Sequence, residues 1–155
     1  MLFLSITMVI STRAHIVKKL DNGKYIGIYH HSDGYPEYLG ELLLNYYDTE
    51  DKLDKLISLG DISFAGPIPE DDPKLWDRHF DFATGRPDYE SDKCKTYKGR
   101  GESGCDARIG DLSDFIGEDF TYVFEDGKWT FYNWDEFMGN LEEMSRASGG
   151  NGLGK

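Results

Sequence analysis

The sequence contains few cysteines, and they lack the spacings that would give them a structural role. Cys94 and Cys105 are the two cysteines in 155 residues, and they form neither a C-x-x-C pair nor a disulfide framework. Two isolated thiols are typical of a protein in a reducing compartment, so we expect it in the cytoplasm. The sequence therefore disfavours both a disulfide-stapled fold and a cysteine-bound zinc ion.

The chain also lacks a hydrophobic run long enough to cross a bilayer. Residues 1–10 are apolar, but they are too short for a membrane span and carry no basic flank of the kind that opens a signal peptide. We interpret this stretch as an additional first strand or as an extended start, with Met8 rather than Met1 as the natural beginning. No membrane partner is expected.

Positive charge is scarce in this sequence. The chain has 29 acidic and 17 basic side chains, which gives a net charge of -12. Residues 41–92 are mostly acidic among their charged positions, whereas residues 93–110 form a locally basic stretch. A surface this acidic repels nucleic acid, so we expect no direct nucleic-acid binding. Two readings of the charge stay open, namely simple solubility and attraction of a basic protein partner.

Familiar catalytic and metal-binding motifs are missing. The sequence has no H-E-x-x-H, no G-x-S-x-G around Ser32, and no P-loop spacing in the glycine-rich stretch after Lys98. Of the four histidines, His30, His31 and His79 could supply ligands or a base, but their spacing fits no closed metal site. We predict no metal and no cofactor, and a binding protein is favoured over an enzyme.

Two β-hairpins are the clearest features that the sequence does contain. Asn22-Gly23 and Asp126-Gly127 each lie between two β-rich runs. Such dipeptides favour tight hairpin turns because asparagine, aspartate and glycine tolerate positive φ angles. The expected strands are residues 15–20, 25–30, 93–97, 120–125 and 128–133. If the second strand persists to its end, His30 and His31 point to opposite faces of the sheet.

Helices are expected between the hairpins and after the second one. Leucines at helical spacing predict a helix over 37–47, and Thr49 is placed to cap a second helix that stops at Gly60. A third helix is expected from 134 to about 146. We expect Leu42, Leu43 and Phe137 to lie under the sheet. Prolines break residues 61–92, which we interpret as a long ordered loop with one helical turn near 75–79.

These elements predict an α+β fold, in which an antiparallel sheet of four to five strands carries helices packed on one side. A parallel α/β arrangement is disfavoured because the spacing offers no strand–helix–strand crossover. We expect a single domain over residues 1–147, followed by a disordered glycine-rich tail at 148–155.

The stretch from Tyr29 to Pro36 has the highest density of chemically capable groups. It holds two imidazoles, a carboxylate and two phenols in eight residues. One interpretation is a polar loop in which Asp33 caps the next helix or closes an Asx turn. The other is a site for a nucleotide-like ligand, or a hydrolase of such a molecule, shared with the basic loop. The residues of this second interpretation are Tyr29, His31, Asp33, Tyr35, Lys98 and Arg100.

Several short segments resemble a family of small uncharacterised phage and bacterial proteins. The similarity lies in Ser11-Thr12-Arg13, in a Tyr-x-His-x-Asp-Gly-Tyr-Pro element beginning at Tyr29, and in the stretch from Tyr122 to Trp129. It covers most of residues 11–132 in short pieces and departs from the family at 61–92. The resemblance implies a phage or prophage context and an accessory role, and it assigns no catalytic residues.

In that context an acidic accessory protein suggests an inhibitor, because acidic side chains can occupy the surface on which a host enzyme binds nucleic acid. We expect the partner to be a basic, nucleic-acid-binding host protein, in the sharpest form a CRISPR or other defence nucleoprotein. The residues expected to contact it are Glu70, Asp71, Asp72, Asp135, Glu136, Glu142 and Glu143. The oligomeric state is not indicated by the sequence.

Overall fold

The computed structural model describes residues 12–77, 80–81, 83, 86–87 and 91–134. The expected first strand at 1–10, the last helix with Phe137, and the boundary at 147 lie outside these described residues. None of the helices in the described part of the chain is long and apolar enough to cross a membrane.

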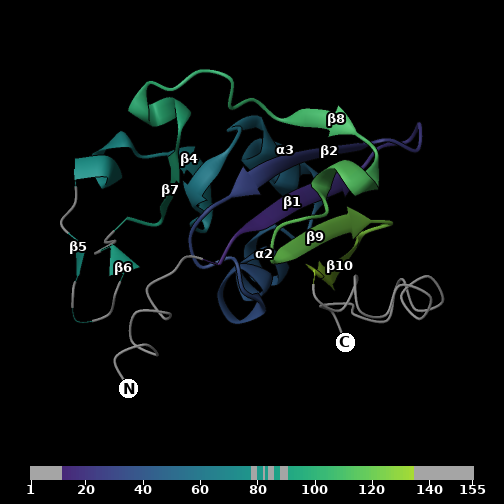
Figure 1. The fold of residues 1–155 in the computed structure, drawn as a ribbon, viewed down its shortest axis with the longest axis horizontal. Helices are drawn as coiled ribbons and strands as arrows, with labels where there is room; N and C mark the ends of the chain where they lie inside the picture. Colours follow the sequence, from purple (N-terminus) through teal and green to yellow (C-terminus); the bar gives the residue numbers. More distant parts are fainter. Residues whose placement is uncertain (1–11, 78–79, 82, 84–85, 88–90, 135–155) are drawn as a thin grey trace.

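Strands dominate the described structure (Figure 1). In chain order they are β1 (Ala14–Lys19), β2 (Tyr25–His30), β3 (Ile62–Phe64), β4 (Ile68–Asp71), β5 (Phe80–Asp81), β6 (Arg86–Pro87), β7 (Lys93–Thr96), β8 (Arg108–Gly110), β9 (Phe120–Glu125) and β10 (Lys128–Asn133). Eight of them form one sheet in the order β10-β9-β1-β2-β3-β7-β4, with β8 also paired to β2. The short β5 and β6 pair separately.

The expected fold class is wrong, because this sheet is mixed and larger than predicted. β1 pairs with β2, and β9 with β10, in antiparallel fashion, but β1 pairs with β9 in parallel. β2 also runs parallel to β3, and β4 parallel to β7. The described residues contain only two short α-helices, α2 (Glu41–Tyr46) and α3 (Glu50–Ser58). A mixed eight-stranded sheet replaces the expected antiparallel sheet of four to five strands with a helical layer.

Both hairpins form where the sequence placed them, but their turns differ. Asp126 and Gly127 have φ angles of 53° and 75°, as a two-residue type I′ turn requires. In the first hairpin only Gly23 has a positive φ, of 84°, and the Leu20 amide donates to the Lys24 carbonyl across a three-residue loop. Glycine therefore closes the first hairpin as a bulge residue rather than as half of a type I′ pair.

The crossover from β2 to β3 explains why the parallel pairing was missed. It consists of the π-helical turn η1 (Pro36–Gly40), α2 and α3, and it returns the chain to β3, which lies beside β2. Thr49 caps α3 as expected, its hydroxyl accepting from the Lys52 amide at 3.4 Å. The prediction had the helices but no strand after them, so it offered no parallel partner for β2.

The region 61–92, expected to be a loop, contains β3, β4, β5, β6 and the 3-10 helix η2 (Pro73–Asp77). β3 is only three residues long, and all three are buried, so it has neither the length nor the alternation by which a strand is recognised. The expected helical turn near 75–79 lies slightly earlier in the chain, as η2. β7 forms as predicted and binds this region to the sheet.

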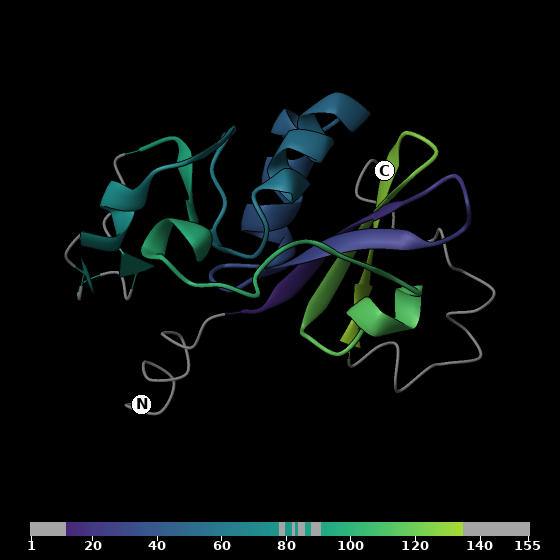
Figure 2. The same cartoon turned by 90° about the horizontal axis from the view of Figure 1, so that it is seen from above.

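The two faces of the sheet are covered differently (Figure 2). Leu42 and Leu43 share a buried cluster with Ile16, Ile28 and other inward residues, so the α-helices cover the face formed by alternate residues of β1 and β2. These two leucines lie where they were expected.

On the opposite face the 3-10 helix η4 (Leu112–Phe115) covers only one half. It does so through Phe115, which packs with Val17 and Val123. A Cβ on Gly27 would stand 2.8 Å from Cε1 of Phe115, so glycine at this position permits the contact. The other half of this face is lined by polar and aromatic side chains.

Candidate functional site

His15, Tyr29 and His31 form an aromatic row across β1 and β2 on the face opposite the α-helices. His15 and Tyr29 are directly opposed in the hairpin register, and their ring centroids are 5.9 Å apart. Tyr29 and His31 are also 5.9 Å apart, and the Tyr29 hydroxyl lies 2.7 Å from Nδ1 of His31. His30 is fully buried on the other face, where its Nε2 accepts from the Ala65 amide at 3.0 Å. The prediction that the adjacent histidines face opposite ways is confirmed.

Burial keeps all three groups of the aromatic row uncharged. It lowers the pKa of His15 to about 4, with the positive charge of Arg108 acting in the same direction. Burial and the nearby Arg13 lower the pKa of His31, while burial raises the pKa of Tyr29 to about 12. A neutral phenol and a neutral imidazole can hydrogen-bond in either direction, so the Tyr29 hydroxyl donates to Nδ1 of His31 in one imidazole tautomer and accepts from it in the other.

Next to the aromatic row lies a tryptophan cluster of Trp76, Lys95, Tyr97 and Arg100. Lys95 Nζ is 4.1 Å from the centre of the Trp76 ring, and the Arg100 guanidinium is 4.4 Å from it. Trp76 Nε1 donates to the Thr96 carbonyl at 2.9 Å, which holds the indole against β7. Two cations over one ring form favourable cation–π contacts. The cluster is therefore an ordered part of the surface.

Other residues of the expected ligand site take part in turns or in ion pairs within the protein. Asp33 has a φ of 56° in the turn after β2, and the N-cap of η1 is Tyr35, without a side-chain cap, so Asp33 does not cap a helix. Lys98 forms an ion pair with Asp106, and Arg100 forms one with Glu102 in addition to its contact with Trp76. The structure thus brings Tyr29 and His31 together and places Arg100 in the neighbouring tryptophan cluster.

Three of the seven expected partner-binding acids lie in the described part of the chain, and each of these three contacts other residues of the protein. Asp71 accepts from the Thr96 amide at 3.0 Å and from its hydroxyl at 2.7 Å. Asp72 accepts from the Lys74 amide at 3.2 Å, and Glu70 pairs with Lys93 at 2.9 Å. Asp71 and Glu70 thus link β4 to β7, while Asp72 contacts the start of η2. The remaining four lie outside the described residues: Asp135, Glu136, Glu142 and Glu143.

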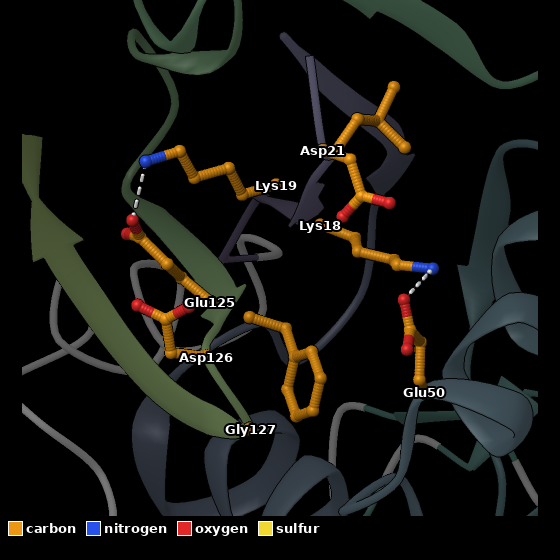
Figure 3. A pocket seen from close by; sticks show the side chains of 9 residues that line it. Lys18, Lys19, Asp21, Glu50, Glu125, Asp126 and Gly127 are labelled. Carbon is orange, nitrogen blue, oxygen red and sulfur yellow. Dashed lines mark hydrogen bonds and ion pairs between the residues drawn. The ribbon is translucent and has the colours of Figure 1, made fainter. Parts of the chain in front are cut away.

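A pocket of about 370 Å³ lies where the turns of the two hairpins meet the start of α3 (Figure 3). We call it the turn-end pocket. Its lining consists of Lys18, Lys19, Leu20, Asp21, Glu50, Phe124, Glu125, Asp126 and Gly127. The parallel pairing of β1 with β9 puts both hairpin turns at this end of the sheet. The pocket is therefore a product of the topology that the sequence did not reveal.

The lysines of the turn-end pocket are already paired with carboxylates. Lys18 Nζ lies 2.8 Å from Glu50 and 2.7 Å from Asp54, and its side chain is only 11% exposed. Burial opposes its charge, but the two carboxylates outweigh burial and raise the pKa of Lys18. Lys19 points away from Lys18 and pairs with Glu125 at 2.7 Å. The lining holds four carboxylates against these two cations, so the pocket is electrostatically negative.

Metal chemistry finds no support in the described part of the chain. No group of three or more histidine, cysteine or carboxylate side chains there could hold an ion. His79 lies outside the described residues. Cys94 is buried, with Sγ 3.4 Å from the Ile68 carbonyl, and burial raises its pKa to about 11. This thiol therefore belongs to the packing of β7 and is no ready nucleophile.

Several residues of these regions were missed by sequence reasoning. His15 could have been found, because the first hairpin's register places it opposite Tyr29. Trp76 and Lys95 could not, because β3 separates β7 from β2 and β3 was not recognised. The turn-end pocket depended in the same way on an unpredicted strand pairing.

Comparisons with family models, with curated proteins and with solved structures found no match to this chain. The resemblance to small phage and bacterial proteins accordingly stays a prediction, and the functional argument depends on geometry and charge.

Proposed function

We propose that the protein is an inhibitory binding protein that engages a basic, nucleic-acid-binding protein of the host through the turn-end pocket. The observation that carries the proposal is the pocket's composition. Its two lysines are paired with carboxylates at 2.7–2.8 Å, while Asp21 and Asp126 stand in the two turns. Leu20 and Phe124 contribute apolar surface to the lining.

An arginine or lysine side chain of a partner matches this lining. Its aliphatic stem would contact Leu20 and Phe124, and its charged head would meet the carboxylates of the turns. Asp51, an exposed acid in the first turn of α3, extends the negative surface beyond the pocket. Charge complementarity of this kind steers association and suppresses wrong partners.

The inhibitory role follows from what such a partner normally binds. A basic surface that binds nucleic acid presents lysines and arginines to phosphates. An acidic protein seated on those side chains excludes the nucleic acid by competition. A CRISPR or related defence nucleoprotein is the form of this partner that the resemblance to phage proteins favours.

The test is capture of the partner with charge-matched variants. Asp21→Asn/Asp126→Asn removes two charges from the pocket, and asparagine tolerates the positive φ of 53° at position 126. Glu37→Gln/Glu41→Gln removes two charges from exposed positions of η1 and α2. Wild type and the second variant should retain a basic nucleic-acid-binding protein from lysates of CRISPR-bearing cells, and the pocket variant should not.

Purified partner then gives the quantitative form of the test. Its affinity should fall as salt rises, because the Debye length is only about 8 Å at physiological ionic strength. Added nucleic acid should compete with the inhibitor. Equal capture by both variants, or capture insensitive to nucleic acid, would contradict the proposal.

A further inference from the structure

We propose that the turn-end pocket takes one arginine side chain of its partner and discriminates against lysine, because its carboxylates can bind both edges of a guanidinium group. This inference rests on the function proposed above and specifies which basic side chain the partner must present. It is argued from the size of the pocket, from the carboxylates that are open to a ligand, and from the apolar part of the lining.

The first step concerns the size and the walls of the pocket. Its volume of about 370 Å³ is near the lower end of the range of about 300–1,000 Å³ for ligand pockets in proteins. The walls come from three separate places in the chain, namely the two hairpin turns and the first turn of α3. The pocket therefore has room for a complete arginine side chain that enters between these walls.

The second step concerns the carboxylates that a ligand can reach. Asp21 and Asp126 are exposed, and neither forms a hydrogen bond or an ion pair with any described residue. Glu50 and Glu125 are each contacted by one lysine of the lining, through Oε1. A carboxylate has about four acceptor sites, so these two glutamates keep capacity for further donors. The acceptors of the pocket thus outnumber the donors that its lysines supply.

The third step concerns the positions of these acceptors around the pocket. Figure 3 shows Glu125 and Asp126 on one side and Glu50 on the other, while Asp21 stands in the first hairpin turn. A guanidinium carries five N–H donors in a planar fork, so it can bind one carboxylate along each edge. An ammonium has three donors around a single nitrogen atom and reaches fewer of these oxygens. Acceptors on separate walls therefore favour arginine.

The apolar part of the lining favours the same side chain. Phe124 is only 6% exposed, and its ring packs edge-on against Trp129 with centroids 5.2 Å apart, so it is a rigid part of the wall. A guanidinium is planar and weakly hydrated and binds well against aromatic rings, whereas an ammonium is strongly hydrated. The aliphatic stem of either side chain can contact Leu20, but the head group of arginine gains more from the ring.

The experiment is an amide NMR titration of the full chain with four peptides of one design. In each, glycine alternates with one other residue, which is arginine, lysine, citrulline or asymmetric dimethylarginine. Citrulline removes the charge, and dimethylarginine keeps the charge but blocks bidentate hydrogen bonding. The arginine peptide should bind about tenfold tighter than the lysine and dimethylarginine peptides, because each of these loses a charge-assisted hydrogen bond. The citrulline peptide should leave the amides of Asp21, Asp126 and Gly127 unshifted.

Single substitutions test whether both turns contribute to the preference. Asp21→Asn and Asp126→Asn should each bring the ratio of arginine to lysine affinity toward one, because each leaves one edge of the guanidinium without a carboxylate. Glu37→Gln/Glu41→Gln, which lies outside the pocket, should keep the ratio near tenfold. All of these positions are exposed, so thermal melts should match wild type.

The outcomes separate this inference from the proposed function. Equal affinities for the arginine and lysine peptides, measured at the amides of the pocket, would overturn the preference for arginine and leave a cation-binding pocket. Dimethylarginine bound as tightly as arginine would contradict recognition through both edges. If no peptide shifted these amides, the proposed function and this inference would both be overturned.

Discussion

The turn-end pocket and the aromatic row share strand β1 but differ in the charge of their side chains. In the pocket, lysines are held by carboxylates of α3 and β9, and acids remain in surplus. In the row, burial keeps the imidazoles of His15 and His31 and the phenol of Tyr29 neutral. One region of the protein is therefore a negatively charged pocket, and the other is an uncharged aromatic surface.

The difference follows from which elements cover each end of the sheet. The pocket is bounded by two turns and a helix start, where acids are favoured by turn conformation and by the helix dipole. The row lies on a half-covered sheet face, where rings pack across strands. A substitution that disturbs the core under β1, which both regions share, should therefore affect both. A substitution that disturbs only one covering element, such as η4 over the row, should affect only the region beneath it.

Leu43→Asp should abolish both regions together. Leu43 is fully buried in the main core, so the substitution buries an unpaired charge and removes a core side chain. The expected loss exceeds about 4 kcal/mol, a large part of the roughly 5–15 kcal/mol by which a typical domain is stable. Circular dichroism should show an unfolded or insoluble chain, whereas exposed Asn45→Asp should melt like wild type. A soluble Leu43→Asp protein with a normal melt would contradict the packing described for α2.

Acid should weaken the histidine-bearing end of the strands and spare the pocket, whose lining contains no histidine. Burial, together with the charge of His31, lowers the pKa of His30 to about 3. Below pH 6.5 the unfolded chain therefore takes up a proton that the folded chain does not. The free energy of unfolding should fall by about 1.4 kcal/mol per pH unit for each such histidine between pH 6.5 and 4.5.

Urea unfolding at several pH values measures this slope. His30→Gln should reduce it, after allowance for the lost contact with the Ala65 amide. An unchanged slope in His30→Gln would show that the acid sensitivity arises elsewhere.

Gly27→Ala should disturb the aromatic row by displacing η4, which packs over one end of it, and should leave the turn-end pocket intact. The new methyl group would stand 2.8 Å from Phe115, so η4 must shift, at a cost of about 1–3 kcal/mol. Chemical denaturation measures the loss. Phe115→Leu combined with Gly27→Ala should cost less than the sum of the two single changes. If the losses in free energy of unfolding simply add, residues 27 and 115 are not in steric contact.

Tyr29→Phe is the smallest change and concerns the row alone. It removes the hydroxyl that lies 2.7 Å from Nδ1 of His31, at a cost of about 1 kcal/mol. NMR titration should show an altered pKa for His31 and no change at amides of the pocket. A His31 titration identical to wild type would exclude the hydrogen bond.

The sequence revealed the local elements of this fold and not their assembly. Both hairpins, the Thr49 cap and β7 were predicted because turn chemistry, capping and alternation are encoded within a few residues. β3 escaped detection because three buried residues between glycine and proline carry no periodic signal. Because β3 was not predicted, neither the parallel partner of β2 nor the position of β7 in the sheet could be predicted.

In the candidate sites, too, residues that are neighbours in the chain were predicted, and residues brought together by strand pairing were missed. Tyr29 and His31 were found because they are neighbours in the chain, while His15 required the hairpin register. The acids at 70–72 stay a prediction as partner-binding residues, but the sequence did not reveal their internal contacts, because charge alone does not show that Asp71 accepts from the amide and the hydroxyl of Thr96. The turn-end pocket needed the β1–β9 pairing, a contact between residues more than a hundred positions apart.

The measurement that tests the account most directly is an amide NMR titration of the labelled protein with a short arginine-rich peptide. The central claim is that basic side chains bind the turn-end pocket. The amide resonances of Asp21, Asp126 and Gly127 should shift when the peptide is added, while those of Tyr29 and His31 stay unchanged. In Asp21→Asn/Asp126→Asn the peptide should cause no such shift, and at high salt the wild-type resonances should return to their positions in the free protein. Shifts centred instead on residues 70–72, or spread evenly over the acidic surface, would contradict the claim.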